Sequence, residues 1–269
     1  MSGDTRLAAN RAAWDRVARE KFAPDVASDV ERLRKGVSSL FPVEREELGP
    51  ILPSCRRAIH LQCSHGLDAL SLWVEGAEEI VGLDFSEPML ALARRKSELL
   101  GAPARWVHAD VLEPPADLLG TAGLVYTGKG ALCWVADLGR WARVVAGLLA
   151  AGGHAYVFEG HPLNWVWEPE AAQLELRSDA DYFARQARVN RDFPGKFLDA
   201  AARPGEAPER AWERQWSLGE IVSSLVAAGL RVTSLREHPE NFWPQLPLVP
   251  EEQARRVPRT FSLLLQKPS

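Results

Sequence analysis

The sequence predicts an α/β protein built on a doubly wound, seven-stranded and mostly parallel sheet. From Arg57 onward, short apolar runs typical of buried strands alternate with longer stretches that have helical periodicity. The expected strands are residues 57–61, 79–83, 104–109, 122–126, 154–158, 231–238 and 259–267. Such alternation is typical of βαβ units, whose sheet is covered by helices on both faces. Since no long helix separates the last two expected strands, the last strand is expected to be antiparallel.

Helices are expected both before the sheet and between its strands. The expected helices are residues 4–21, 26–35, 42–50, 67–75, 86–100, 137–149 and 217–229. Ser86 supplies an N-cap and Gly101 a C-terminal stop for one of them, while Ser217 and Glu220 form a capping box for another. Because three helices precede the first strand, residues 1–50 are expected to form an N-terminal helical lid on a core of residues 51–269.

Residues 160–216 interrupt this alternation and are predicted to form a cap inserted into the core. The segment is rich in aromatic side chains, prolines and charges, and it lies between two expected strands. Trp165 and Trp167 follow a strand end in a loop flanked by prolines. Binding residues concentrate on loops held by a rigid scaffold, so these two side chains are expected to contact a substrate.

Composition excludes several classes of protein. The 269 residues are 46% hydrophobic and 25% charged, with a formal net charge of -4 and no basic block longer than three residues, which argues against a nucleic-acid partner. No run approaches the ~18 apolar residues of a membrane span, and the N-terminal stretch lacks the apolar core of a signal peptide. The three cysteines are widely spaced, which argues against a disulfide framework and a metal site. We therefore expect a cytoplasmic protein with no membrane and no metal.

Residues 58–70, AIHLQCSHGLDAL, have the strand, turn and helix order of a nucleotide-binding loop but only one of its glycines. That glycine is Gly66. Gln62 and Ser64 carry side chains where a glycine-rich loop would let the backbone approach a pyrophosphate. A ligand without phosphates is therefore preferred.

Two acidic residues follow successive strands on the same edge of the expected sheet. Asp84 ends the second strand, where a carboxylate can accept hydrogen bonds from a ribose diol, and Asp110 ends the third, where it could bind an adenine amino group. The alternatives are that Asp84 caps the helix beginning at Ser86 and that Asp110 caps a turn. An NAD-dependent oxidoreductase would explain Asp84 but not Asp110 or the reversed final strand pair. S-adenosylmethionine has the ribose and adenine without the phosphates.

The chain resembles the class I S-adenosylmethionine-dependent methyltransferases, in the group whose first motif reads LQCxxG. The matching stretches are LQCSHGLDALSL (61–72), VGLDFSEPML (81–90), HADV (108–111), VYTGKGALCWVADLGRWARVV (125–145) and FEGHP (158–162). The resemblance covers most of the chain and is weakest over residues 165–210. It implies a Rossmann-like methyltransferase fold, S-adenosylmethionine as cofactor, and methyl transfer to a nitrogen or oxygen nucleophile of a small-molecule acceptor.

The resemblance also implies a cofactor site along the strand ends. The residues carried over by position are Gln62, Cys63, Ser64, Gly66, Asp84, Phe85, Met89, Asp110, Val111, Thr127 and Gly128. Residues 62–66 would hold the methionine half, and Asp84 the ribose hydroxyls. Asp110 and the backbone N–H of Val111 would bind the adenine, with Phe85 packed beside it. The two residues that end the fourth strand would lie near the sulfonium.

Two further residues are candidates for substrate contact. Lys129 follows the fourth strand and is either a solvated loop lysine or an acceptor contact. Trp14 either packs its helix onto the core or lines the pocket, since an N-terminal helix often covers the cofactor in proteins of this architecture.

His161 and Glu159 are the candidate catalytic residues, because both lie at the end of the fifth strand. A neutral imidazole could accept a proton from an O–H or N–H nucleophile as the methyl group transfers. Glu159 could orient His161 or bind a cationic acceptor. The alternatives are that His161 only holds its loop, and that a neutral amine attacks without a base. At the level of the whole protein, the alternatives are a non-catalytic S-adenosylmethionine-binding or scaffold protein and an NAD-dependent oxidoreductase.

Overall fold

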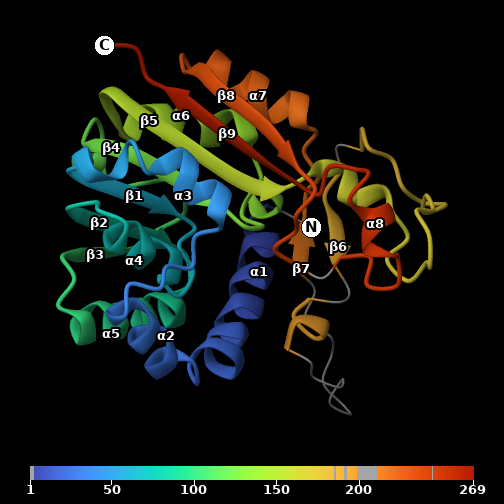
Figure 1. Ribbon diagram of the computed structural model, residues 1–269, viewed down its shortest axis with the longest axis horizontal. Coiled ribbons are helices and arrows are strands. Elements are labelled where there is room, and N and C mark those ends of the chain that lie inside the picture. Colours follow the sequence, from blue (N-terminus) through green and yellow to red (C-terminus); the bar gives the residue numbers. More distant parts are fainter. Residues whose placement is uncertain (1–2, 185, 191–192, 199–210, 244) are drawn as a thin grey trace.

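A seven-stranded sheet forms the centre of the computed structural model (Figure 1). The structure describes residues 3–184, 186–190, 193–198, 211–243 and 245–269. The strands are β1 (Arg57–Leu61), β2 (Glu79–Asp84), β3 (Ala104–His108), β4 (Ala122–Gly128), β5 (Leu149–Gly160), β8 (Arg231–His238) and β9 (Thr260–Gln266). They are arranged in the order β3-β2-β1-β4-β5-β9-β8.

The sheet confirms the predicted fold class. Neighbouring strands from β1 to β5 pair in parallel, and β9 lies antiparallel between β5 and β8. Because β9 is antiparallel to both neighbours, β8 runs in the same direction as β5. The carboxyl ends of β1, β2, β4, β5 and β8 therefore meet at one edge, where open α/β sheets bind ligands.

Alternate residues of the strands build two apolar cores, one on each face of the sheet. In β1, Ala58 contributes to the core beneath α3 (Pro42–Leu48) and α4 (Leu67–Val74), while Ile59 contributes to the opposite core. That opposite core is covered by α6 (Leu138–Leu148) and α7 (Leu218–Ala227).

The helix ends follow the signals in the sequence. α5 (Glu87–Leu100) begins at Ser86, whose side chain accepts from the Met89 N–H, and ends at Gly101 with φ +66°. α7 begins with the reciprocal hydrogen bonds of a capping box between Ser217 and Glu220. Each bond satisfies a backbone N–H that the first helical turn would otherwise leave unpaired.

The N-terminal segment covers the lower part of the carboxyl edge (Figure 1). α1 (Gly3–Val17) continues into a π-helical turn over Ala18–Phe22, and α2 (Val26–Arg34) follows. These elements pack on α5, whereas α3 packs on the sheet and buries Leu48 completely. Within residues 1–50, α1 and the π-helical turn cover the carboxyl edge, and α2 packs on α4 and α5.

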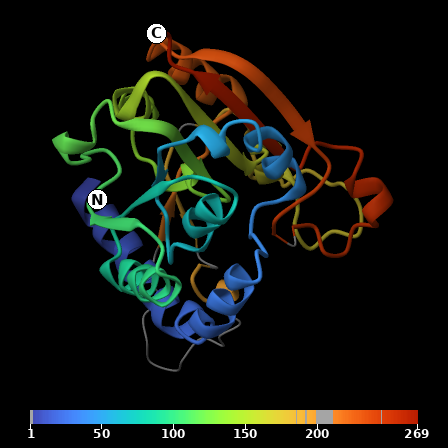
Figure 2. The same ribbon diagram turned by 60° about the vertical axis from the view of Figure 1, so that its left-hand side comes forward.

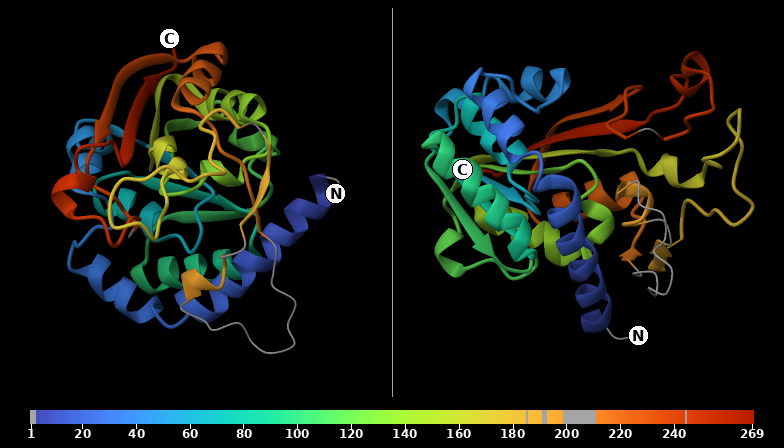
Figure 3. Two further views of the ribbon diagram at one scale, coloured as in Figure 1. Left: turned by 90° about the vertical axis from the view of Figure 1, so that its right-hand side faces the viewer. Right: turned by 90° about the horizontal axis from the view of Figure 1, so that it is seen from below.

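Two segments that are far apart in the sequence project together beyond the carboxyl edge (Figures 2 and 3). The first includes Pro162–Val166 and the two-stranded sheet of β6 (Arg188–Asn190) and β7 (Ala211–Glu213). The second lies between β8 and β9 and contains α8 (Glu251–Ala254). Leu246, Val249 and Ala254 of the second segment form an apolar cluster with Trp167 and Leu174 of the first.

Within the part of the chain that is described, no helix combines the length and apolar composition needed to cross a membrane. The described residues also contain no group of three or more histidine, cysteine, aspartate or glutamate side chains placed to hold a metal ion.

Candidate active site

The loop after β1 keeps the backbone conformation of a glycine-rich loop although most of the glycines are missing. Gln62, Ser64 and Gly66 have φ values of +55°, +50° and +78°. A residue with a Cβ pays about 1–2 kcal/mol for this left-handed conformation, which glycine adopts freely. Gln62 and Ser64 can keep this conformation only because the surrounding structure holds them in it. Strained backbone of this kind is common at ligand sites.

Gly66 is required by packing as well as by its backbone angle. A Cβ at this position would lie 2.6 Å from the Cβ of Ala93 and 2.7 Å from the ring of Trp106. The same ring excludes a side chain at Gly82, where a Cβ would lie 2.3 Å away. Trp106 therefore fills the space over β2 and supports the loop from behind.

Asp84 ties this loop to the start of α5. Its carboxylate accepts hydrogen bonds of 2.8 Å from the backbone N–H groups of Ser64 and Ser86. Burial raises the pKa of Asp84 to about 6, although those two hydrogen bonds act to lower it. Ser86 in turn donates to Asp15 of α1 at 2.5 Å, which links the N-terminal covering to the same point.

A cavity of about 250 Å³, which we call the loop cavity, opens beside residues 62–66. Its wall contains seven of the eleven predicted cofactor residues: Gln62, Cys63, Ser64, Asp84, Phe85, Met89 and Gly128. Trp14 and Phe22 cover it from the N-terminal segment. Two buried polar atoms of the wall, Nδ1 of His60 and Oε1 of Gln62, have no hydrogen-bond partner among the described residues. Unpaired buried polar atoms are expected where a ligand binds.

Gly66, Asp110, Val111 and Thr127 are not part of that wall. Gly66 lies behind it, and Asp110 accepts from the backbone N–H of Leu112 at 2.8 Å. Val111 packs in the apolar core, and Thr127 is 2% exposed. Contact between these four residues and the cofactor stays a prediction.

A buried ion cluster forms the floor of the loop cavity. The Lys129 ammonium lies 2.8 Å from Asp68 and 3.3 Å from Glu44, and it also donates to the Ser39 carbonyl at 3.2 Å. Burial alone would raise the pKa of Asp68, but the charge of Lys129 holds it below its usual range. Lys129 is thus a buried, paired residue rather than a solvated one.

His60 and Asp68 of this floor were not predicted. His60 is fully buried at the end of β1, and burial lowers its pKa to about 4, so its ring is neutral. The sequence did carry a signal for both residues, because they flank the 62–66 loop on either side. Glu44 carries no such signal, since it comes from α3.

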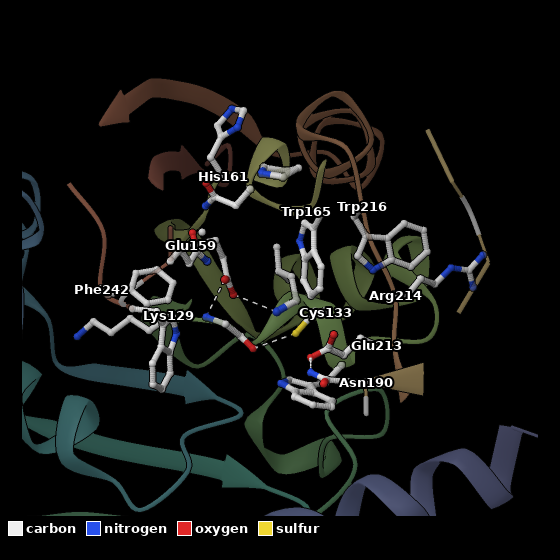
Figure 4. A pocket seen from close by; sticks show the side chains of 18 of the residues that line it. Lys129, Cys133, Glu159, His161, Trp165, Asn190, Glu213, Arg214, Trp216 and Phe242 are labelled. Carbon is white, nitrogen blue, oxygen red and sulfur yellow. Dashed lines mark hydrogen bonds between the residues drawn. The ribbon is translucent and has the colours of Figure 1, made fainter. Parts of the chain in front are cut away.

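A second cavity of about 300 Å³, the ring cavity, lies between the sheet edge and the projecting segments (Figure 4). Its described wall holds nine aromatic side chains: Trp14, Trp134, Trp165, Phe193, Phe197, Trp216, Phe242, Trp243 and Phe261. The two cavities share part of their walls, namely Trp14, Lys129, Gly130, Trp134, Phe197 and Trp243. Trp165 lines this cavity, and its contact with a substrate stays a prediction. Trp167 packs instead in the apolar cluster with α8.

Glu159 holds the loop that separates the two cavities. Its carboxylate accepts from the backbone N–H groups of Gly130 and Ala131 at 2.7 Å and of Leu132 at 3.0 Å. Burial raises its pKa, against these hydrogen bonds. The carbonyl of Ala131 accepts from Gln62 at 2.9 Å, so the 62–66 loop and the 130–132 loop are joined.

His161 lines the ring cavity, but its imidazole points away from the other labelled side chains (Figure 4). Nδ1 accepts from the Leu163 N–H at 3.1 Å. Nε2 lies 2.9 Å from Oε1 of Glu237 on β8, without a well-aligned hydrogen bond. Burial lowers the pKa of His161, and Glu237 acts in the opposite direction. A base role for His161 stays a prediction.

The chain is similar to known proteins over part of its sequence. Residues 58–153 match the family model of a methyltransferase domain. A demethylmenaquinone methyltransferase of Thermus thermophilus is 36% identical over 86 residues, which are 31% of this chain and 37% of that protein. The match thus spans little more than a third of this relative.

Solved structures share the fold over most of the chain. An S-adenosylmethionine-dependent methyltransferase of Mesorhizobium loti has a TM-score of 0.61 at 21% identity, covering 84% of this chain and 96% of the other. Geranyl diphosphate C-methyltransferase of Streptomyces coelicolor, in complex with S-adenosylhomocysteine, has a TM-score of 0.55 at 12% identity, covering 84% and 78%. The matched segment, residues 58–153, is therefore similar to a methyltransferase domain, and most of the chain shares its fold with class I S-adenosylmethionine-dependent methyltransferases. The cofactor of this class is S-adenosylmethionine.

Proposed function

We propose that the protein transfers a methyl group from S-adenosylmethionine to a nitrogen or oxygen atom of a small-molecule acceptor, releasing S-adenosylhomocysteine. The observation that carries this proposal is the shared wall of two cavities at the carboxyl edge of the sheet. One cavity is bounded by the loop and carboxylate typical of cofactor binding, and the other by apolar rings. A reaction between two ligands requires such an adjacent pair of sites.

The loop cavity is proposed to bind the cofactor, which supplies a methyl group already activated by the positive charge of its sulfonium. Asp84 would accept hydrogen bonds from the ribose hydroxyls. The ammonium of Lys129 and the carboxylate of Asp68 would face the zwitterionic amino-acid end, assisted by the unpaired Nδ1 of neutral His60.

The ring cavity is proposed to bind the acceptor. The shared wall has four rings, from Trp14, Trp134, Phe197 and Trp243, at the point where the two ligands would meet. These rings exclude water and limit the orientation of the acceptor, so that its nucleophile is held in line with the transferred methyl group. The concave, ring-lined cavity and the net charge of -4 favour a small molecule over a nucleic acid.

Proton removal is proposed to need no base from the shared wall. Lys129, the only titratable residue among the described residues of that wall, is paired with Asp68 and Glu44. Both oxygens of Glu159 accept backbone hydrogen bonds. A neutral amine can attack with its free lone pair and lose a proton afterwards, which makes nitrogen the favoured nucleophile. A phenolic oxygen would need His161 or solvent as base.

Ligand binding and turnover test the proposal in sequence. S-adenosylhomocysteine should raise the melting temperature of the protein and NAD should not, because only ligands of the native state shift unfolding. A methyl-release screen over small molecules should then identify an acceptor. Stabilisation by NAD alone would favour an oxidoreductase, and S-adenosylmethionine binding with no acceptor in a broad screen would favour a binding protein.

A further inference from the structure

The residues that line the ring cavity indicate which charge its ligand has. Aromatic rings attract cations over their faces through the ring quadrupole, so a cavity lined by rings commonly binds quaternary or protonated amines. In this protein, however, several of the rings already carry a cation from the chain itself.

Three rings of the wall have protein cations stacked on them. The Arg188 guanidinium lies 4.4 Å from the ring centroid of Trp165, and the Arg214 guanidinium lies 4.5 Å from that of Trp216. The Lys21 ammonium lies 4.2 Å from the centroid of Phe197. A cationic ligand inside the cavity would contact rings that already hold a cation of the chain. Two like charges on the same ring repel each other in a poorly hydrated site.

The two carboxylates among the described residues of the wall already accept hydrogen bonds from the chain. Glu159 accepts three backbone N–H groups, as described above. Glu213 accepts from Asn190 Nδ2 at 2.7 Å, and it is the cross-strand partner of Arg188 in the β6–β7 pair. The positive charge of Arg188 thus lies beside both Trp165 and Glu213, and the wall offers a cationic ligand little net attraction.

We infer that the ring cavity selects a neutral, planar and electron-rich aromatic acceptor, such as an aromatic amine or a phenol, and rejects acceptors that carry a positive charge. A ring polarised by a cation on one face becomes a better partner for an electron-rich ring on its other side. This inference rests on the proposed function, because it names the substrate class of the same site.

A pair of probes that differ only in charge tests the inference. 4-tert-Butylphenol and (4-hydroxyphenyl)trimethylammonium have nearly the same shape, and only the second is a cation. Calorimetry on the full chain saturated with S-adenosylhomocysteine should show the neutral probe binding at least about tenfold more tightly. Equal or tighter binding of the cation, or no measurable binding of the neutral probe, would overturn the inference.

Variants locate the origin of the selectivity. Arg188→Met and Arg214→Met keep much of the side-chain length but remove the charge, so each should reduce the preference for the neutral probe about threefold. Arg95→Met is the matched control, because Arg95 is 62% exposed on α5 and pairs only loosely with Glu98 at 3.9 Å. An unchanged preference in both cavity variants would contradict the role of these cations.

Failure of this inference can be told apart from failure of the proposed function. Saturation with S-adenosylhomocysteine is measured first and on its own, by titration of the protein without a probe. If that titration succeeds and the cation is preferred, only the substrate class is wrong. If S-adenosylhomocysteine does not bind while the neutral probe still binds selectively, the inference about the ring cavity holds. The proposed cofactor of the loop cavity is then wrong.

Discussion

The loop cavity and the ring cavity share a wall but differ in how they are built. The loop cavity is formed by strand ends, a strained backbone loop and a buried ion cluster, all carried by the sheet and the helices next to it. The ring cavity is formed largely by apolar rings from segments that project beyond the sheet. A fixed cofactor needs charges and backbone groups at fixed points, whereas an acceptor site can be reshaped by exchanging side chains on loops.

This contrast predicts that single substitutions in the loop cavity change stability or ligand affinity strongly, and that substitutions in the ring cavity change them less. The largest is expected for Lys129→Met, which leaves the buried carboxylates of Asp68 and Glu44 without their cation. Removal of one partner from a buried ion pair typically costs about 3–5 kcal/mol. Denaturant unfolding should show a loss of this size.

Two further variants control that measurement. Combining Lys129→Met with Asp68→Asn should recover part of the lost stability, since it also removes a charge that would otherwise be buried alone. Lys35→Met, at an ion-pair lysine that is 67% exposed, should change stability by less than about 1 kcal/mol. A loss no larger for Lys129 than for Lys35 would show that the floor of the loop cavity is hydrated and adaptable.

Asp84→Ala should produce the next largest effect, on cofactor affinity. It removes hydrogen bonds to a charged group, each worth ~1.5–3 kcal/mol, and it also frees the backbone N–H of Ser64 that shapes the loop. We expect the dissociation constant of S-adenosylmethionine to rise about 100-fold by calorimetry. Asp110→Ala is the comparison, because its described hydrogen bond closes a local turn. An equal loss of cofactor affinity in both variants would show that the cofactor site reaches Asp110, after the end of β3.

The pKa of Asp84 gives a pH dependence with a definite sign. Because the folded-state pKa of about 6 lies above the ordinary value of 3.8, the native state binds more protons between these pH values, and stability falls as pH rises through the window. Ribose hydroxyls prefer the ionised carboxylate, so cofactor affinity should show the reverse trend and weaken about tenfold per pH unit below 6. Asp84→Asn should abolish this dependence. Its persistence in Asp84→Asn would assign the titration to another group.

In the ring cavity, Trp165→Ala should weaken acceptor binding about tenfold and leave cofactor affinity unchanged, because Trp165 lines only that cavity. Trp167→Ala should mainly lower the melting temperature, since its ring packs with Leu246 and Val249. Equilibrium binding of the neutral phenol and thermal unfolding separate the two outcomes. Weakened cofactor binding in both variants would show that the two cavities are not independent.

The sequence predicted the features that depend on local pattern. Strand periodicity and helix caps placed the sheet, and strand ends placed Asp84, Phe85 and Gly128 on the wall of the loop cavity. The ion cluster could not be predicted, because Glu44, Asp68 and Lys129 come from three separate elements and meet only in the folded chain.

The largest gap in the sequence-based prediction concerns residues 239–258, to which no structure was assigned. Phe242 and Trp243 line the ring cavity from this segment. Both residues follow β8, and a strand parallel to β5 ends at the same edge of the sheet as the predicted cofactor residues. The direction of β8 depends on the insertion of β9 between it and β5, which the sequence pattern does not reveal.

The smallest effect is expected for His161→Ala, although sequence reasoning made His161 the candidate base. Its Nδ1 accepts from a backbone N–H, its Nε2 faces Glu237, and burial lowers its pKa. A base acts only within hydrogen-bond reach of the proton that it removes. We therefore expect single-turnover methyl transfer, with both ligands saturating, to stay within about threefold of wild type. His154→Ala is the matched control, because His154 lies near the middle of β5 and lines neither cavity. General base catalysis is worth about 10²–10⁴-fold, so a loss of that size in His161→Ala alone would show that the ring turns into the cavity when the acceptor binds. Since His161 is only 6% exposed, both variants are compared at a temperature where circular dichroism shows them folded.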